Sequence, residues 1–160
     1  MFVLKMNFMR LFIVLFLLIG FQSLGAINRE RFYSVFESNS LDEINKEIQL
    51  LTKEKSSPQK DAFLGAMVMK RAQFLKTPKD KISVFKEGKN LLESAIKSQP
   101  KNAEFRFLRL AIQENCPKIL KYNTNKEEDS KTITSRYSTM HHITKKHVKK
   151  YALHSQQLNL

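Results

Sequence analysis

The amino-acid sequence predicts an all-α protein. Apolar residues recur three and four positions apart through most of the chain, the spacing that places them on one face of a helix. Helix start signals precede several of these stretches. No alternating strand pattern and no Asn-Gly or Asp-Gly hairpin turn occurs. We therefore expect six to seven helices arranged in antiparallel hairpins.

The start of the chain has the order of a secretory signal peptide. Lys5 and Arg10 are followed by the apolar run Leu11–Phe21 and then by small residues that include Gly25 and Ala26. A membrane-spanning helix needs about 20 apolar residues, and this run is shorter. We expect cleavage after Gly25 or Ala26, which makes the mature protein periplasmic or secreted. An uncleaved N-terminal anchor is the alternative.

Residues 1–26 are thus assigned to the signal peptide, residues 27–138 to a helical domain, and residues 139–160 to a basic C-terminal helix or tail. The first helix is expected over residues 29–38. Ser40 begins a capping box with Glu43, in which each side chain satisfies a backbone N–H of the other residue. The second helix follows it, with one apolar face formed by Leu41, Ile44, Ile48 and Leu51.

Two further helices begin at Ser-Pro and Thr-Pro pairs. Ser57 and Thr77 each precede a proline, which fits the first position of a helix because its missing N–H is not needed there. The stretch over residues 62–75 is apolar nearly all round, so this helix is expected to be central and covered by its neighbours. The next stripe covers residues 82–96 and ends before Pro100.

The remaining chain is expected to add two helices and a connector. A fifth helix is expected over residues 102–113, followed by an ordered connector over residues 117–124. Asn125, with Glu128 three residues later, is expected to cap a sixth helix that reaches about Tyr137.

The junction between the fourth and fifth helices resembles that of tetratricopeptide repeats. Ala95 lies five residues before Pro100, and the string Lys101–Glu104 (KNAE) follows. In those repeats a small residue lies at a helix crossing and a proline ends one helix as the next begins. The Leu64-Gly65 pair lies too far upstream for a unit of about 34 residues, so at most one degenerate repeat is expected.

A longer stretch, residues 87–133, contains the string EFRFLR at residues 104–109 and the acidic cluster at residues 127–129. With these marks it resembles an uncharacterised family of exported helical proteins from Bacteroidetes-type bacteria. Members often carry glycine where this chain has Lys121. The resemblance implies a periplasmic or secreted helical protein and implies no activity.

Glycine and cysteine usage excludes two classes of site. After the signal peptide only Gly65 and Gly88 remain, both inside helical patterns, so no phosphate-binding loop or dinucleotide-binding turn can form. Gly88 lies on an apolar stripe and is expected to permit a close helix crossing. Cys116 is the single cysteine, so no intrachain disulfide can form. Because Pro117 places Cys116 at a helix end, where the dipole disfavours a thiolate, we expect a buried structural thiol.

The four histidines do not have the spacing of a metal site. They are His141, His142, His147 and His154. Histidines that share a helical metal site lie about four residues apart. Here His142 and His147 are five residues apart, and His147 and His154 are seven apart. No carboxylate follows Asp129 to complete a set of ligands. We expect surface histidines and no bound metal or cofactor.

Arginines and acids on neighbouring helices form a candidate cluster. Arg106 and Arg109 share one helix face because they lie three residues apart. Glu127, Glu128 and Asp129 open the following helix, where acids complement the helix dipole. We expect structural ion pairs between these groups. The alternative is that the acids bind a ligand.

The C-terminal end carries charge of one sign. Residues 131–160 contain six lysines and arginines and no acid. Four of them bunch on a last helix expected over residues 144–157: Lys145, Lys146, Lys149 and Lys150. Export argues against nucleic acid, so the candidate partners are an anionic envelope surface or an acidic protein. The alternative is a solvated helix face.

No catalytic constellation interrupts the helical periodicity. We therefore expect a non-enzymatic, exported interaction or structural module of the cell envelope. Its partner would be an unknown protein or an anionic envelope surface, with no nucleic acid bound and no transmembrane segment left after signal cleavage. One alternative is a small enzyme or ligand-binding protein whose site only a pocket in the structure can reveal. Another is an electrostatic binder that works through the basic tail.

Overall fold

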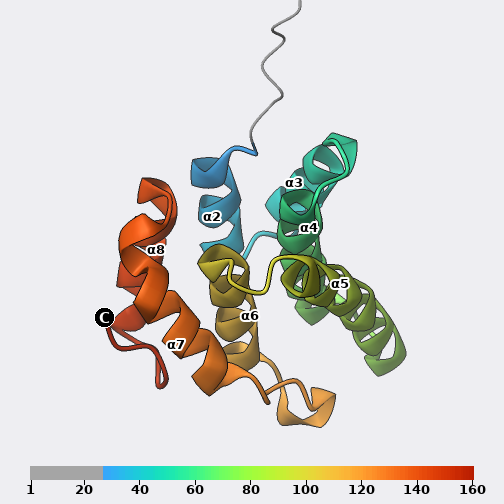
Figure 1. Ribbon diagram of the computed structural model, residues 1–160. Helices are drawn as coiled ribbons and strands as arrows, with labels where there is room; N and C mark the ends of the chain where they lie inside the picture. Colours follow the sequence, from blue (N-terminus) through green and yellow to red (C-terminus); the bar gives the residue numbers. More distant parts are fainter. Residues whose placement is uncertain (1–26) are drawn as a thin grey trace, which may run out of the picture.

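The computed structural model describes residues 27–160, and this part of the chain is all-helical, as the sequence predicts. The expected signal peptide and its cleavage site lie outside the described residues. Seven α-helices make up most of the described part (Figure 1): α2 (Arg29–Glu37), α3 (Leu41–Lys53), α4 (Pro58–Arg71), α5 (Pro78–Ser98), α6 (Ala103–Asn115), α7 (Lys126–Arg136) and α8 (His142–Ala152). Three short 3₁₀ helices lie between them: η1 (Ala72–Phe74), η2 (Lys118–Leu120) and η3 (Tyr137–Thr139). No helix among residues 27–160 is both long and apolar enough to cross a membrane.

Polar side chains fix the starts of the first five α-helices. Each accepts a hydrogen bond from a backbone N–H of the first turn, which would otherwise lack a partner. These caps are Asn28, Ser40, Ser57, Thr77 and Asn102. The capping box predicted at Ser40 forms only in part. Ser40 Oγ accepts from the Glu43 N–H at 3.3 Å, but the Ser40 N–H donates to Ser38 Oγ at 3.4 Å rather than to Glu43.

The cap predicted at Asn125 is wrong in its chemistry. Asn125 does precede α7, but its side chain accepts no hydrogen bond from the first turn of that helix. Its Oδ1 accepts from the Thr124 hydroxyl at 3.0 Å instead. The neighbouring hydroxyl therefore competes for the group that the cap would use.

The last helix ends earlier than the sequence predicts. α8 begins two residues before Thr144 and stops at Ala152, well short of Gln157. Beyond it the chain folds back onto α6, where the Glu114 carboxylate accepts hydrogen bonds from the backbone N–H groups of Gln156 and Gln157, both at 3.1 Å. These hydrogen bonds hold the backbone after α8 against Glu114 of α6, which a continued helix would not reach.

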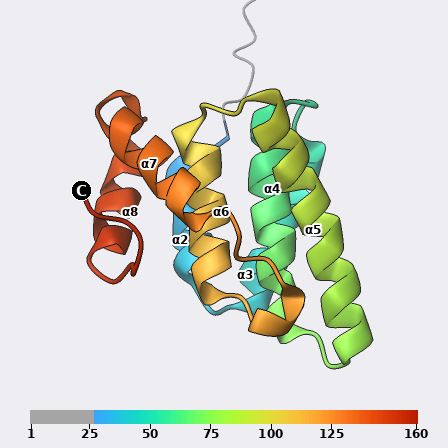
Figure 2. The same cartoon turned by 60° about the horizontal axis from the view of Figure 1, so that its bottom comes forward.

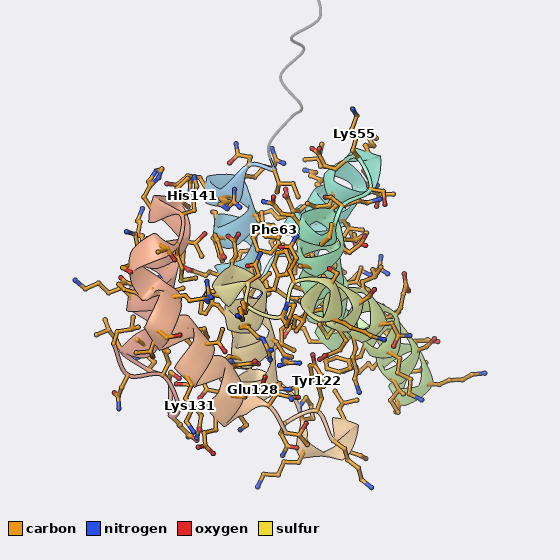
Figure 3. The ribbon with its side chains drawn as sticks, in the orientation of Figure 1. Lys55, Phe63, Tyr122, Glu128, Lys131 and His141 are labelled. Carbon is orange, nitrogen blue, oxygen red and sulfur yellow. The ribbon has the colours of Figure 1, made fainter. Side chains whose placement is uncertain are left out.

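Helix α4 lies at the centre of the fold, as its all-round apolar pattern predicts. It packs against α3, α5 and α6, and Figure 2 shows it between α5 and α6. Its Phe63 is fully buried beneath α2 and contacts the rings of Phe32 and Tyr33 (Figure 3). α7 and α8 cover the other side of α6 and close the fold.

The closest helix crossing joins α4 and α5, which run antiparallel. The two glycines of the described chain face each other there, and a Cβ placed on Gly88 would lie 2.5 Å from the carbonyl oxygen of Gly65. The predicted role of Gly88 at a close crossing is confirmed. The tetratricopeptide resemblance paired α5 with α6 instead, and its repeat-like detail stays a prediction.

The connector between α6 and α7 contains a strained residue. Lys121 has φ 47° and ψ 42°, the left-handed conformation that favours glycine. It ends η2 and turns the chain so that Tyr122 is buried. The tight turn thus forms with lysine in the left-handed conformation.

Lys121→Gly is expected to raise the free energy of unfolding by about 1 kcal/mol. A non-glycine residue in the left-handed conformation costs roughly 1–2 kcal/mol. Glycine removes this strain but loses more conformational entropy on folding, which offsets part of the gain. Lys118→Gly, three residues earlier in an ordinary right-handed conformation, is the control and should lower stability. Urea denaturation measures both. A destabilising Lys121→Gly substitution would contradict the assignment of strain.

Candidate functional site

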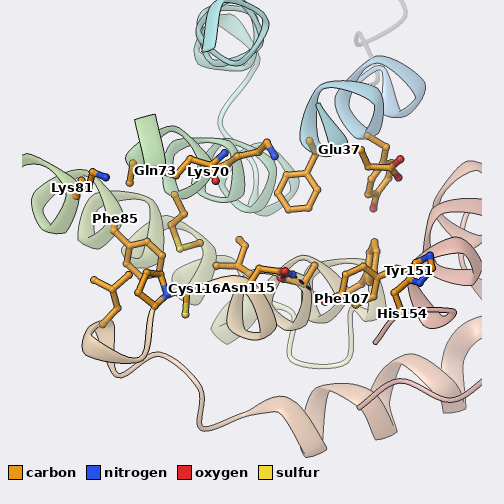
Figure 4. Close-up of a pocket in the computed structure, with 18 of the residues that line it drawn as sticks. Glu37, Lys70, Gln73, Lys81, Phe85, Phe107, Asn115, Cys116, Tyr151 and His154 are labelled. Atoms are coloured by element: carbon orange, nitrogen blue, oxygen red, sulfur yellow. Dashed lines mark hydrogen bonds between the residues drawn. The ribbon is translucent and has the colours of Figure 1, made fainter. Parts of the chain in front are cut away.

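A half-open groove of about 610 Å³ lies between α2, the end of α4, the start of α5, α6 and α8. Its lining is mostly apolar. Phe107, Ala111 and Ile112 of α6 form one wall, and Pro78, Ile82 and Phe85 of α5 form part of the other. We call this cavity the groove. Phe85 and Cys116 lie at one end of it, and Phe107, Tyr151 and Glu37 lie at the other (Figure 4).

The rim of the groove exposes large apolar side chains. Ile119, in η2, is 81% exposed, and Ile82 is 37% exposed. Burying an exposed isoleucine removes water from its surface and contributes on the order of 1.5–3 kcal/mol. Both side chains line the groove and are partly or largely open to water. The rim is therefore suited to contact an apolar ligand.

A polar group closes the end of the groove at α2. Glu37 Oε1 lies 2.5 Å from Nδ1 of His147, and Glu37 Oε2 accepts a hydrogen bond from Lys150 Nζ at 2.6 Å. Burial raises the pKa of Glu37, but the hydrogen bonds from Lys150 and His147 outweigh this and leave the pKa below its usual value. Glu37 is therefore a carboxylate, which can only accept, so Nδ1 of His147 carries the proton.

The other nitrogen of His147 has no partner. The His147 ring lines the groove and stacks on Tyr33, with the ring centres 4.6 Å apart. Its Nε2 is shielded from solvent and makes no hydrogen bond to any described residue. A buried polar atom without a partner costs free energy, so this nitrogen is suited to receive a polar group of a ligand.

Lys70 places a second cation near this end. Its Nζ lies 5.8 Å from the centre of the Phe36 ring, and it forms no salt bridge within residues 27–160. Burial lowers the pKa of Lys70, and the nearby Glu37 charge raises it by less. Figure 4 shows the Lys70 side chain extended along the groove on the side of Glu37. The ammonium group is therefore partly desolvated and not neutralised.

Cys116 lines the groove but is a poor nucleophile. Its thiol lies 3.3 Å from the Tyr122 carbonyl oxygen and donates a hydrogen bond to it. Burial raises the pKa of this thiol, which keeps it protonated. The sequence predicted a buried structural thiol, and the side chain is partly buried. It holds the connector against the end of α6.

The expectation of surface histidines is wrong for one of the four. His141, His142 and His154 are exposed, whereas His147 is buried because it lies on the face of α8 that packs against α2. Within residues 27–160 no group of three or more histidine, cysteine or acidic side chains is arranged to hold a metal ion.

The arginine and acid cluster lies away from the groove. The buried Asp129 carboxylate accepts three hydrogen bonds, two from Arg109 at 2.6 and 2.7 Å and one from Arg106 at 2.9 Å. Arg106 also contacts Glu128 at 2.9 Å. Glu127 does not join this cluster and pairs with Lys131 on the surface. These residues fasten α6 to α7 and do not line the groove.

The four tail lysines occupy different environments. Lys150 pairs with Glu37 and lines the groove, and Lys145 donates to the Ser138 carbonyl oxygen at 3.3 Å. Lys146 and Lys149 are exposed. Docking of these lysines onto an anionic surface stays a prediction.

Sequence reasoning missed the groove because its residues come from five helices and follow no motif. Glu37 and Lys70 stand in ordinary helical stretches, and nothing in their spacing separates them from solvated charges. The exposed Ile119, next to Lys118 in the connector, is a local sign of an apolar rim.

Comparison with protein-family models, curated proteins and solved structures finds no match to this chain. Its function is therefore inferred from the geometry of the groove and from the sequence.

Proposed function

We propose that this chain is an exported, non-enzymatic module of the cell envelope that binds the hydrocarbon part of a small ligand in the groove. The observation that carries the proposal is the groove itself, a mostly apolar cavity of about 610 Å³ between five helices. Small-molecule sites have volumes of about 300–1,000 Å³ and are lined mainly by apolar and aromatic side chains with a few polar groups. Export rests on the basic, apolar and small-residue order of the first 26 residues.

Binding is favoured over catalysis by the state of the polar groups. Glu37 orients His147 as a carboxylate orients a catalytic base, but such a base needs a hydroxyl or thiol within hydrogen-bond reach. Nε2 of His147 has no such partner among residues 27–160. The Cys116 thiol is held by a backbone carbonyl and kept protonated. The groove thus offers polar recognition without an activated nucleophile.

Nile red fluorescence tests the proposal with an uncharged probe, and unlabelled dodecanol competes with it. The mature protein is expected to bind the dye saturably and to release it when dodecanol is added. Ala111→Phe places a ring inside the groove and should weaken binding at least tenfold. Ile119→Asp removes apolar surface at the rim, where folding does not depend on it, and should weaken binding about fivefold.

Leu153→Asp is the matched control, since Leu153 is 76% exposed and does not line the groove. It should bind the dye as wild type does. Circular dichroism verifies that every variant keeps its helical spectrum and cooperative melting. The proposal fails if wild type shows no saturable binding, or if Ile119→Asp and Leu153→Asp bind alike.

A further inference from the structure

The ionisable side chains of the groove are mostly cationic. Three lysines line it, Lys70, Lys81 and Lys150, against one carboxylate, Glu37. Glu37 is already engaged by Lys150 and by His147. The lining therefore carries an excess of positive charge. Lys70 lies near enough to Glu37 to feel its charge and has no salt bridge in the described chain. Such a lining complements an anion.

Two groups near Glu37 lack a partner among the described residues. Nε2 of His147 is buried without a partner, and the His147 ring is held by Glu37. Lys70 Nζ lies against Phe36, the residue next to Glu37 along α2. Nε2 of His147 lacks a hydrogen-bond partner, and the Lys70 ammonium lacks a counter-charge. The rest of the cavity toward Phe85 is mostly apolar, and its polar side chains include Gln73, Lys81 and Asn115.

We propose that the groove takes a single-chain amphiphile with a carboxylate head, which lies between Lys70 and His147 while the hydrocarbon chain runs along α6 toward Phe85. This inference rests on the proposed function and adds the chemical class of the ligand. The carboxylate neutralises the Lys70 ammonium. One proton is taken up together with the ligand and makes His147 an imidazolium, in which Nδ1–H stays on Glu37 and the new Nε2–H donates to the ligand carboxylate. Charge-assisted bonds of this kind are about twice as strong as those between neutral groups.

Among residues 27–160 no arginine lines the groove, which favours a carboxylate over a phosphate head. Planar guanidinium groups recognise phosphate through paired hydrogen bonds, and a doubly charged head needs more than one free cation to compensate its desolvation. Lys81 is exposed and lies at the Phe85 end, away from Lys70 (Figure 4). The head site therefore offers one free charge and one hydrogen-bonding nitrogen, which matches a single carboxylate.

Laurate and dodecanol separate the head from the chain because both carry the same number of carbons. We expect wild type to bind laurate about tenfold more tightly than dodecanol, at concentrations below those at which laurate forms micelles. Lys70→Gln should reduce laurate affinity to the level of dodecanol and leave dodecanol affinity unchanged. His147→Gln should reduce the preference for laurate as well.

Lys149→Gln is the matched control, because Lys149 is exposed on α8 and does not line the groove. It should keep the full preference for laurate. Lys70 is half-buried and forms no salt bridge within the described residues, so its variant is expected to fold. The chemical shift of Nε2 of His147 in wild type gives a readout that needs no substitution. The protonation that accompanies laurate binding should move that shift far more than the hydrogen bond that the dodecanol hydroxyl can donate to Nε2.

The outcomes distinguish the two proposals. If both ligands bind with equal affinity, or if Lys149→Gln loses as much laurate affinity as Lys70→Gln, the carboxylate inference is wrong and the apolar groove still binds. If neither ligand binds, the proposed function fails together with the inference.

Discussion

Replacing Asp129 with alanine is expected to lower the free energy of unfolding by about 3–5 kcal/mol, because it leaves two buried guanidinium groups without their shared counter-charge. The Asp129 side chain is fully buried, and Arg106 and Arg109 are 7% and 3% exposed. Burial lowers the pKa of Arg109, but the hydrogen bonds to Asp129 outweigh it and raise that pKa. Guanidinium groups stay protonated in proteins, so both arginines keep their charge when the carboxylate is removed.

Glu127→Ala is the control for Asp129→Ala. Glu127 lies two residues earlier in the same first turn of α7, but its pair with Lys131 is exposed, with both side chains more than three-quarters accessible. Exposed pairs contribute about 0–1 kcal/mol, so this substitution should change stability little. Urea denaturation of the mature protein compares the two. Similar losses from both substitutions would show that helix capping, rather than the buried pair, dominates.

The helices could be predicted because their signals are local. Ser57 and Thr77 cap helices that begin with proline, and each cap acts through backbone groups within three residues of itself. The all-round apolar pattern of α4 likewise predicts, from that segment alone, that the helix is buried on all sides. Such features need no knowledge of the rest of the chain.

The end of α8 and the burial of His147 could not be predicted in this way. Glu114 captures the backbone after α8 from a position more than forty residues upstream. His147 meets Glu37 across an interval of 110 residues. The groove has the same origin, since its walls meet only when α2, α6 and α8 have packed. Which side chains would share a cavity is therefore a property of the packing and not of any segment.

Gly88 shows both sides of this contrast. Its place on an apolar stripe of α5 predicts a close crossing, and that prediction is confirmed. The sequence does not say which residue faces it. In the structure Gly65 of α4 faces Gly88. A Cβ on either glycine would overlap the carbonyl oxygen of the other.

Gly88→Ala is expected to destabilise the protein by about 1–3 kcal/mol through overpacking. The added Cβ would lie 2.5 Å from the Gly65 carbonyl oxygen and 2.7 Å from the Met69 nitrogen, and both are backbone atoms that cannot rotate away. In an exposed helix the same substitution would stabilise by about 0.5–1 kcal/mol, since alanine is the better helix former. The sign of the change measured by urea denaturation therefore decides between crossing and exposure. Glu87→Ala, at the exposed neighbouring position, should be nearly neutral.

A double substitution tests whether the two glycines act on the same contact. Gly65→Ala alone should cost about as much as Gly88→Ala, because its Cβ would lie 2.6 Å from the Gly88 carbonyl oxygen. Once one added methyl group has moved α4 away from α5, the second finds part of its space already open. The double variant should then lose less stability than the two single variants together, by about 0.5 kcal/mol or more. Additive losses would mean that each glycine accommodates a separate neighbour and that the helices do not move apart as rigid bodies.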